Sequence, residues 1–231
     1  MARRALLAAA LLVASPLLAQ DALPPGLHGE EKLAALVQRV SQVQASLTTL
    51  KAAFEQRRTS KLLAEPSVSR GTFYYQAPDS VRWEYESPRP MTVLLAGGVA
   101  ITYRPAEKRA ERVEVGRAQR RVFRFISAAE PLEKLKAYFS FTFRDAGGAS
   151  DYQLELRPTT HVIRKRLKQL DIGIDRRTLL PVRVAYVETD GDGTEYAFSN
   201  VETNTRLAAD LFNLTLPADV KVVSLKLGSG E

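Results

Sequence analysis

The sequence predicts a mainly β fold with a few helices: an open, incomplete antiparallel β-barrel or strongly curved sheet that the helices cover. The first observation is the alternation of apolar and charged residues in Ser80–Ser87, which is typical of a strand with one buried face. The second is a series of short extended stretches separated by turn signals, such as Gly97–Gly98 between Met91–Leu95 and Val99–Tyr103. The third is the scarcity of helical periodicity, which disfavours the strand–helix–strand units of a parallel sheet.

The N-terminal stretch Met1–Ala19 has the pattern of a secretory signal peptide. Arg3 and Arg4 precede the apolar run Ala5–Val13, and cleavage is expected after Ala19. The run is too short to span a bilayer, which disfavours an uncleaved anchor. The chain of 231 residues contains no cysteine, so neither disulfides nor thiolate metal sites are expected. We therefore expect an exported, periplasmic protein with a single domain over residues 20–231.

Two segments are expected to form helices. Gly29–Leu50 carries apolar residues at helical spacing, and Glu30 and Glu31 in its first turn favour the helix dipole. Pro131–Phe139 begins with a proline at a favourable first-turn position and places its apolar residues on one face. Amphipathic helices commonly cover a core, and we expect the first helix to lie over the aromatic strands.

The remaining regular segments are expected to be strands in hairpin order. Proline, glycine and aspartate punctuate them, as at Ala77–Asp79 and Asp190–Gly193. The expected strands are Thr49–Ser60, Gly71–Gln76, Ser80–Ser87, Met91–Leu95, Val99–Tyr103, Arg109–Val115, Ser140–Arg144, Tyr152–Arg157, Leu167–Asp175, Pro181–Glu188, Thr194–Val201 and Asp219–Leu227. Residues 116–130 are expected to form a short helix or an irregular cover.

Aromatic residues are concentrated between Gly71 and Tyr103, which include the only tryptophan, Trp83, and four of the eight tyrosines. Within Ser80–Ser87, Val81, Trp83 and Tyr85 share one face, so their charged neighbours are expected to face water. Two interpretations of the aromatic face remain open. It could fill an ordinary core, or it could line a concave surface too wide to be filled by its own side chains, which would then hold an apolar ligand.

The sequence shows no constellation of catalytic or metal-binding residues. His28 and His161 are far apart in the chain, and the nucleophile elbow Gly–x–Ser–x–Gly is absent. Asp190–Glu195 faintly resembles a calcium loop, but it lacks the bidentate glutamate at the twelfth position, and a hairpin turn explains it better. We expect no catalytic residue, no metal and no cofactor.

Basic residues form two groups in a chain of formal net charge +7. The first group lies between Arg104 and Arg124 and consists of Arg104, Lys108, Arg109, Arg112, Arg117, Arg120, Arg121 and Arg124, against Glu107, Glu111 and Glu114. The second group is Arg164, Lys165, Arg166 and Lys168. Each could be a solvated face, or it could dock on an acidic partner or on anionic lipid headgroups. Nucleic acid is disfavoured as a partner because an exported protein would rarely meet it.

The order of the short motifs resembles that of the LolA-like family of periplasmic outer-membrane lipoprotein carriers. The motifs are Phe54–Glu55–Gln56, Gly71-x-Phe73-x-Tyr75-x-x-Pro78, Val81-x-Trp83-x-Tyr85-x-x-Pro88, Tyr103–Arg104–Pro105, and Asp210–Leu211–Phe212 leading into Leu216–Pro217. The likeness extends over Leu33 to Val223. It departs at Ala77, where the best-known carriers have an arginine before the proline, so the role of that arginine in cargo release does not carry over.

The resemblance implies a carrier rather than an enzyme. Such a protein would bind lipoprotein acyl chains in a hydrophobic cavity and carry them, as a monomer, from an inner-membrane ABC-type exporter to an outer-membrane acceptor. The expected cavity residues are Phe54, Phe73, Tyr75, Val81, Trp83, Tyr85, Leu95 and Tyr103, and Arg117, Arg120, Arg121 and Arg124 are the expected docking residues. The alternatives are an exported sensor of lipid or lipoprotein, or a carrier of another amphiphile; a lipid hydrolase is disfavoured because no triad or metal constellation is present.

Overall fold

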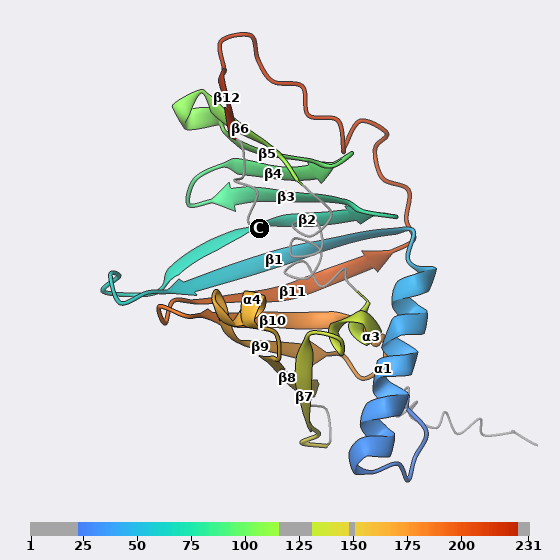
Figure 1. The fold of residues 1–231 in the computed structure, drawn as a ribbon. Helices are drawn as coiled ribbons and strands as arrows, with labels where there is room; N and C mark the ends of the chain where they lie inside the picture. The colour runs from blue at the N-terminus through green and yellow to red at the C-terminus, as the bar shows by residue number, and fades with distance from the viewer. Residues whose placement is uncertain (1–22, 116–130, 148–150, 226–231) are drawn as a thin grey trace, which may run out of the picture.

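The computed structural model describes residues 23–115, 131–147 and 151–225, and its main feature is one curved sheet of twelve strands that does not close (Figure 1). The strand order is β12–β6–β5–β4–β3–β2–β1–β11–β10–β9–β8–β7. The strands are β1 (Thr49–Thr59), β2 (Ser67–Gln76), β3 (Ser80–Ser87), β4 (Met91–Ala96), β5 (Val99–Arg104), β6 (Arg109–Glu114), β7 (Phe139–Arg144), β8 (Tyr152–Pro158), β9 (Leu167–Ile174), β10 (Pro181–Glu188), β11 (Gly193–Thr203) and β12 (Lys221–Leu225). The helices are α1 (Gly29–Ser46), η1 (Pro105–Glu107), α3 (Leu132–Leu135) and α4 (His161–Arg164).

Two antiparallel meanders make up this sheet, and they meet at its centre. Strands β2 to β6 extend from β1 on one side, and β10 back to β7 extend from β11 on the other. The junction is the antiparallel pairing of β1 with β11, in which Phe54 lies opposite Phe198. The last strand, β12, adds in parallel to β6 at the edge, whereas the sequence predicts antiparallel pairing throughout.

The buried apolar side chains form two clusters on one face of the sheet. The helix-side cluster lies on β7 to β10 and includes Leu36, Val37 and Val40 of α1. The aromatic cluster consists of Phe54, Phe73, Val81, Trp83, Leu95, Ala100, Val115 and Tyr196. Tyr186 and Phe198 pack against both clusters, so the two form one continuous apolar face.

The position of α1 differs from the expectation that it covers the aromatic strands. It runs along the β7–β11 half of the sheet, beside α3 (Figure 1). Its buried residues belong to the helix-side cluster, and only its C-terminal end reaches the aromatic half. Among the described residues, no helix is long and apolar enough to cross a membrane.

The helices are shorter than the sequence predicts. Helix α1 ends at Ser46 rather than at Leu50, because Leu47 is extended, with φ −76° and ψ 119°, and β1 begins two residues later. Helix α3 is a single turn, because Phe139 already belongs to β7. The short helix α4 is not predicted from the sequence, which indicates a loop around His161.

The opposite face of the sheet is largely polar, and the connection from β11 to β12 covers part of it. Arg82 donates through Nη1 to the backbone oxygen of Leu211 at 2.7 Å, and its side chain is only 13% exposed. Leu94 and Ala110 share this face by strand register, and both are buried. The expectation that the charged residues of β3 face water is therefore wrong for Arg82, which is held between Glu84 and this connection.

Candidate ligand-binding site

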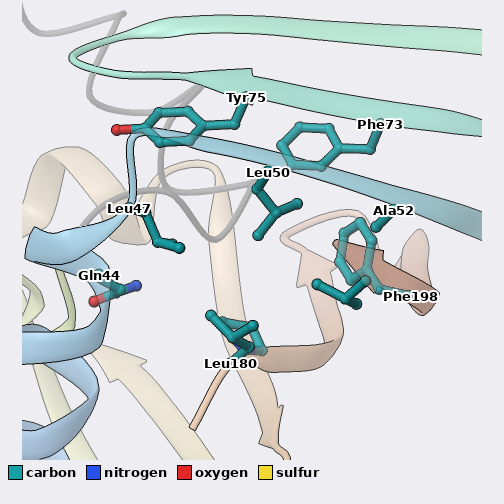
Figure 2. Close-up of a pocket in the computed structure, with 10 residues that line it drawn as sticks. Gln44, Leu47, Leu50, Ala52, Phe73, Tyr75, Leu180 and Phe198 are labelled. Atoms are coloured by element: carbon teal, nitrogen blue, oxygen red, sulfur yellow. The ribbon is translucent and has the colours of Figure 1, made fainter. Parts of the chain in front are cut away.

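A small apolar pocket lies between the C-terminal end of α1 and the sheet. Figure 2 shows the side chains of Leu47, Leu50, Phe73, Leu180 and Phe198 around a common space. Gln44, Ala52, Tyr75, Pro181 and Val201 complete the lining. The cavity volume is about 40 Å³, enough for a few water molecules.

The aromatic cluster continues from this pocket across β2, β1 and β3. Phe73 lines the pocket and also contacts Trp83, with 4.5 Å between the ring centroids. Trp83 is in turn 4.8 Å from Phe54 in an edge-to-face arrangement, and 4.8 Å from Tyr196. Such arrangements are favourable for aromatic pairs. The pocket and the rings therefore make one continuous apolar region, which we call the apolar surface, and its rings are buried and packed on one another as in a core.

Seven of the eight expected cavity residues lie on this surface. Phe54, Phe73, Val81, Trp83 and Leu95 are buried members of the aromatic cluster, and Tyr75 and Tyr85 are half-buried beside them. Strand register explains their proximity, because Phe73 pairs with Trp83, and Val81 pairs with both Tyr75 and Leu95. Contact of these residues with a ligand stays a prediction.

Tyr103 lies on the other face of the sheet. Strand β5 places Ala100 in the aromatic cluster, and Tyr103, three positions further along, points to the opposite side. Its register partners are Thr92 and Ala110, of which Ala110 is buried on that side. We therefore leave Tyr103 out of the candidate site. The arginines Arg117, Arg120, Arg121 and Arg124 lie outside the described residues.

At one end of the apolar surface, buried polar groups replace the purely apolar side chains. Gln56 donates through Nε2 to the phenol oxygen of Tyr196 at 2.9 Å, and both residues are buried. The phenol groups of Tyr85 and Tyr186 lie near that of Tyr196, close enough for each to raise its pKa. Burial raises the pKa of each of the three phenols, so all three stay protonated at neutral pH. The surface is thus amphipathic along β1, apolar near α1 and hydroxyl-rich at the far end.

Several lining residues escape sequence reasoning because they come from a distant part of the chain. Leu180 and Phe198 enter the pocket only because β11 pairs with β1 and β10 pairs with β11. The alternation of Thr194, Tyr196 and Phe198 indicates a strand with one buried face, but it does not indicate which face of the protein that strand joins. Leu47 and Leu50 continue the helical spacing of apolar residues in α1. The spacing therefore predicts that they belong to the helix, and it does not indicate that they line a pocket.

Helix α1 is held over the sheet at both ends. Near its C-terminal end, Gln44 Oε1 accepts a hydrogen bond from the backbone N–H of Leu132 at 3.1 Å. Ser41 Oγ accepts one from the backbone N–H of Glu133 at 3.4 Å. These two bonds join α1 to α3 and close the space beside the pocket.

The N-terminal end of α1 is held to the rest of the protein by ion pairs. Lys32 Nζ lies 2.6 Å from a carboxylate oxygen of Asp145, which also pairs with Arg176. Both cations lie over the ring of the buried Tyr152, with Arg176 at 4.2 Å and Lys32 at 5.7 Å from its centroid. Burial acts to raise the pKa of Asp145, but hydrogen bonds from Lys32, Arg176 and the N–H of Gly147 outweigh it, so this pKa lies well below its usual range.

The described residues contain no cluster of side chains suited to binding a metal ion. No group of three or more histidine, aspartate or glutamate side chains gathers there in a way that could hold an ion. Asp190 instead accepts a hydrogen bond from the backbone N–H of Asp192 at 3.0 Å, in the turn between β10 and β11. The site is therefore characterised by its apolar surface and its phenol groups.

Comparison with known protein families gives one match over most of the chain. The model described as outer membrane lipoprotein carrier protein LolA matches residues 45–215. Two similar relatives carry the name outer-membrane lipoprotein carrier protein. The relative from Methylibium petroleiphilum is 28% identical over 183 residues, which cover 78% of this chain and 85% of the relative. The relative from Dechloromonas aromatica is 28% identical over 179 residues, covering 76% and 81%.

Comparison with solved structures supports the fold alone, because the identities are low. An uncharacterized conserved protein from Thermus thermophilus superposes with a TM-score of 0.52 at 11% identity, covering 84% of this chain and 99% of that chain. The structure of MucB superposes with a TM-score of 0.50 at 14% identity, covering 82% of this chain. The chain spans 64% of the MucB chain, which is therefore considerably longer than the shared fold.

Proposed function

Because the chain belongs to the family of the outer membrane lipoprotein carrier protein LolA, we propose that it binds the acyl chains of lipoproteins and carries them through the periplasm. The observation that carries this proposal is the continuous apolar surface from the pocket at the end of α1 to the rings of β1, β2, β3 and β11. An acyl chain requires a surface of this kind because its binding depends on removing apolar area from water.

The affinity that such a carrier needs follows from the length of the acyl chain. A chain of about 15 carbons gains about 12 kcal/mol on burial, at about 0.8 kcal/mol per CH₂. The site must offer most of this free energy, or cargo would not stay bound in water. It must not offer much more, or cargo would not leave. Half-buried residues such as Tyr75 and Tyr85 keep the affinity between these limits, because only part of their apolar area remains in contact with water and can be buried by cargo.

Binding of an acyl chain in this pocket requires that α1 moves relative to the sheet. The pocket has room for only a few water molecules, whereas ligand pockets commonly measure about 300–1,000 Å³. The two hydrogen bonds from Ser41 and Gln44 to α3 are neutral, and each is worth only about 1 kcal/mol. Breaking them would let the C-terminal end of α1 lift and would extend the pocket towards the aromatic cluster.

In this proposal the protein is an exported monomer that makes and breaks no covalent bond. It accepts cargo from an inner-membrane ABC-type exporter and gives it to an outer-membrane acceptor. The family membership supports this route, and the basic group Arg117, Arg120, Arg121 and Arg124 is proposed as a docking face for these partners. The hydroxyl-rich end of the apolar surface would accommodate the more polar part of the cargo, where acyl chains are joined to the protein.

The test is a charge placed in the pocket. Leu50 is half-buried in the pocket lining, so Leu50→Glu puts an unpaired carboxylate where acyl chains are proposed to lie, while the partly exposed position lets the fold survive. We expect binding of a triacylated lipopeptide, measured by native mass spectrometry, to weaken tenfold or more. The matched control is Leu225→Glu on β12, at an exposed leucine remote from the pocket, which should bind normally.

Two results would contradict the proposal. The first is normal lipopeptide binding by Leu50→Glu with a melting curve like that of the unaltered protein. The second is a lipopeptide that is recovered in cleaved form, because a carrier returns its cargo chemically unchanged, and the same mass spectra report this.

A further inference from the structure

Three exposed apolar side chains lie towards one end of the sheet, two in a projecting loop and one on a short helix set back from it. Leu62 and Leu63 lie in the loop between β1 and β2 and are 94% and 45% exposed, and Val162 of α4 is 77% exposed. Figure 1 shows this loop projecting beyond the neighbouring turns, with α4 towards the same end of the sheet. None of the three side chains belongs to either buried cluster. We call Leu62, Leu63 and Val162 the apolar tip.

The loop that carries the two leucines has a defined turn. The backbone N–H of Leu62 donates to Ser60 Oγ at 3.3 Å, and that of Leu63 donates to the backbone oxygen of Ser60 at 3.1 Å. These bonds satisfy backbone donors within the loop and leave the leucine side chains directed away from the sheet, as their exposure shows. The leucines are therefore displayed by the turn.

The turn between β10 and β11 connects the loop to α4. Gly191 in this turn lies against Lys61, since a Cβ built on Gly191 would stand 3.5 Å from Lys61 Cε. Thr189 in the same turn donates through its N–H to the backbone oxygen of Arg166, and through Oγ1 to that of Lys165, each at 3.2 Å. The loop, the turn and the segment after α4 thus form one structured end.

Positive charge surrounds the apolar tip. Exposed basic side chains next to it are Arg57, Arg58, Lys61, Arg164, Lys165 and Arg166. The acidic residues at this end are Glu65, Glu188, Asp190, Asp192 and Glu195, which lies opposite Arg57, so the basic residues are in excess by one. A projecting apolar group with a basic surround matches the layers of an anionic bilayer, where acyl chains lie beneath negatively charged headgroups.

We propose that the apolar tip docks this protein directly on the surface of an anionic phospholipid bilayer. The leucines and Val162 enter the boundary between headgroups and acyl chains, and the surrounding arginines and lysines pair with lipid phosphates. The narrow tip suits a bilayer better than a folded protein partner, because a stable protein interface needs about 800 Å² from each side. The proposal rests on the chemistry of the tip and does not depend on the cargo.

Docking in this orientation would bring the hydroxyl-rich end of the candidate site towards the bilayer, with the pocket at the end of α1 further away. Arg58 is next to the loop and also lies close enough to Tyr186 and Tyr196 to act on their pKa. It therefore links the apolar tip to the hydroxyl-rich end of the aromatic surface. An amphiphile that leaves this end would meet the lipid headgroups first.

The experiment measures sedimentation of the full chain with vesicles. We expect binding to vesicles of phosphatidylethanolamine and phosphatidylglycerol, and much weaker binding to vesicles of phosphatidylcholine alone. Binding should also weaken as salt is added, since each surface charge is screened. Leu62→Ser should reduce binding about tenfold, because it removes an apolar side chain that the bilayer would otherwise bury. Leu225→Ser, at a 44% exposed leucine on β12, should leave binding unchanged.

Three results would overturn the proposal: no sedimentation with anionic vesicles, equal binding by Leu62→Ser and the unaltered chain, or equal loss with Leu225→Ser. Val162→Ser supplies an independent second variant, with a loss smaller than that of Leu62→Ser because its side chain is smaller. Lipopeptide binding in solution should be the same for Leu62→Ser and the unaltered chain. If the carrier proposal fails, neither protein binds lipopeptide in solution, and the vesicle result stays intact.

Discussion

Gly71 lies where two strands and an aromatic ring leave no room for a side chain. It belongs to β2, opposite Phe54 on one side and Tyr85 on the other. A Cβ at this position would overlap the backbone oxygen of Glu84, and it would stand 2.8 Å from the carbonyl carbon of Glu84 and 3.0 Å from the Phe54 ring. The backbone of β3 can therefore approach closely only because residue 71 is glycine.

We predict that Gly71→Ala destabilises the protein by about 3 kcal/mol, because the added methyl group meets backbone that cannot turn away. In a chain of this size that loss lowers the melting temperature by roughly 6–12 °C. Gly173→Ala is the matched control, since its nearest neighbour is a side-chain carbon of Arg183 at 3.1 Å. Thermal unfolding followed by circular dichroism compares the two; an equal effect at both positions would contradict the steric explanation.

Tyr103 shows how a single residue can be assigned to the wrong face within a correctly predicted strand. The hairpin turn at Gly97–Gly98 pairs Leu95 with Ala100, so Ala100 takes the face of Leu95. Alternation then places Tyr103 on the opposite side. Aromatic character suggested the ligand face, but strand register decides the question, and register follows from the two-residue turn.

Among the elements, strands are predicted best where the signal is local. The bounds of β3 and β10 match the predicted Ser80–Ser87 and Pro181–Glu188, because turn residues punctuate both ends. The sequence predicts helix α1 but places its C-terminal end too late. Leu47 and Leu50 keep the helical spacing of apolar residues, although they lie outside the helix and line the pocket. Helix α4 is one turn long and has no buried residue, so it leaves no periodic signal in the sequence.

The N-terminal anchor of α1 predicts a pH-dependent stability. Asp145 joins Lys32 of α1 to Arg176 in the turn after β9, and its pKa in the folded protein is lowered. A lowered pKa means that this carboxylate stabilises the fold at pH values above its unfolded pKa of about 3.9, and that the contribution is lost as the pH falls further. The stabilisation is thus fully present at neutral pH.

We predict that Asp145→Asn lowers the free energy of unfolding by about 2 kcal/mol at pH 7, because it leaves two partly buried cations without their shared anion. The difference from the unaltered protein should narrow as the pH is lowered below about 4. Denaturant unfolding at pH 7 and pH 3 checks this, and a difference that does not change with pH would contradict it.

At the scale of the whole molecule, the sequence predicts an open, curved antiparallel sheet but not which distant strands pair within it. Each hairpin is a local event, so two antiparallel meanders follow from turn signals alone. The pairing of β1 with β11 joins distant parts of the chain, and so does the parallel pairing of β12 with β6. No local pattern encodes either pairing, yet the first one brings Phe198 to Phe73 and creates the candidate site.

The absence of cysteine from the whole chain allows a direct test of whether α1 must move for cargo to bind. Ser41 Oγ of α1 lies 3.4 Å from the backbone nitrogen of Glu133 in α3, so cysteines at both positions would be neighbours, and loss of free thiols on oxidation would verify a disulfide between the two helices. We predict that the oxidised double variant Ser41→Cys/Glu133→Cys binds triacylated lipopeptide at least tenfold more weakly than the same protein after reduction. The bond would hold the C-terminal end of α1 beside the closed pocket.

Each single-cysteine variant serves as the control for this comparison, because it carries one substitution and cannot form the internal bond. Both singles should bind lipopeptide equally well with and without reductant. The oxidised double variant should also be at least as resistant to heat as its reduced form, since the cross-link restricts the unfolded chain. If the oxidised protein is thermally stable and still binds lipopeptide at full strength, the acyl chains enter without separation of α1 from α3. The opening would then lie on another side of the aromatic cluster.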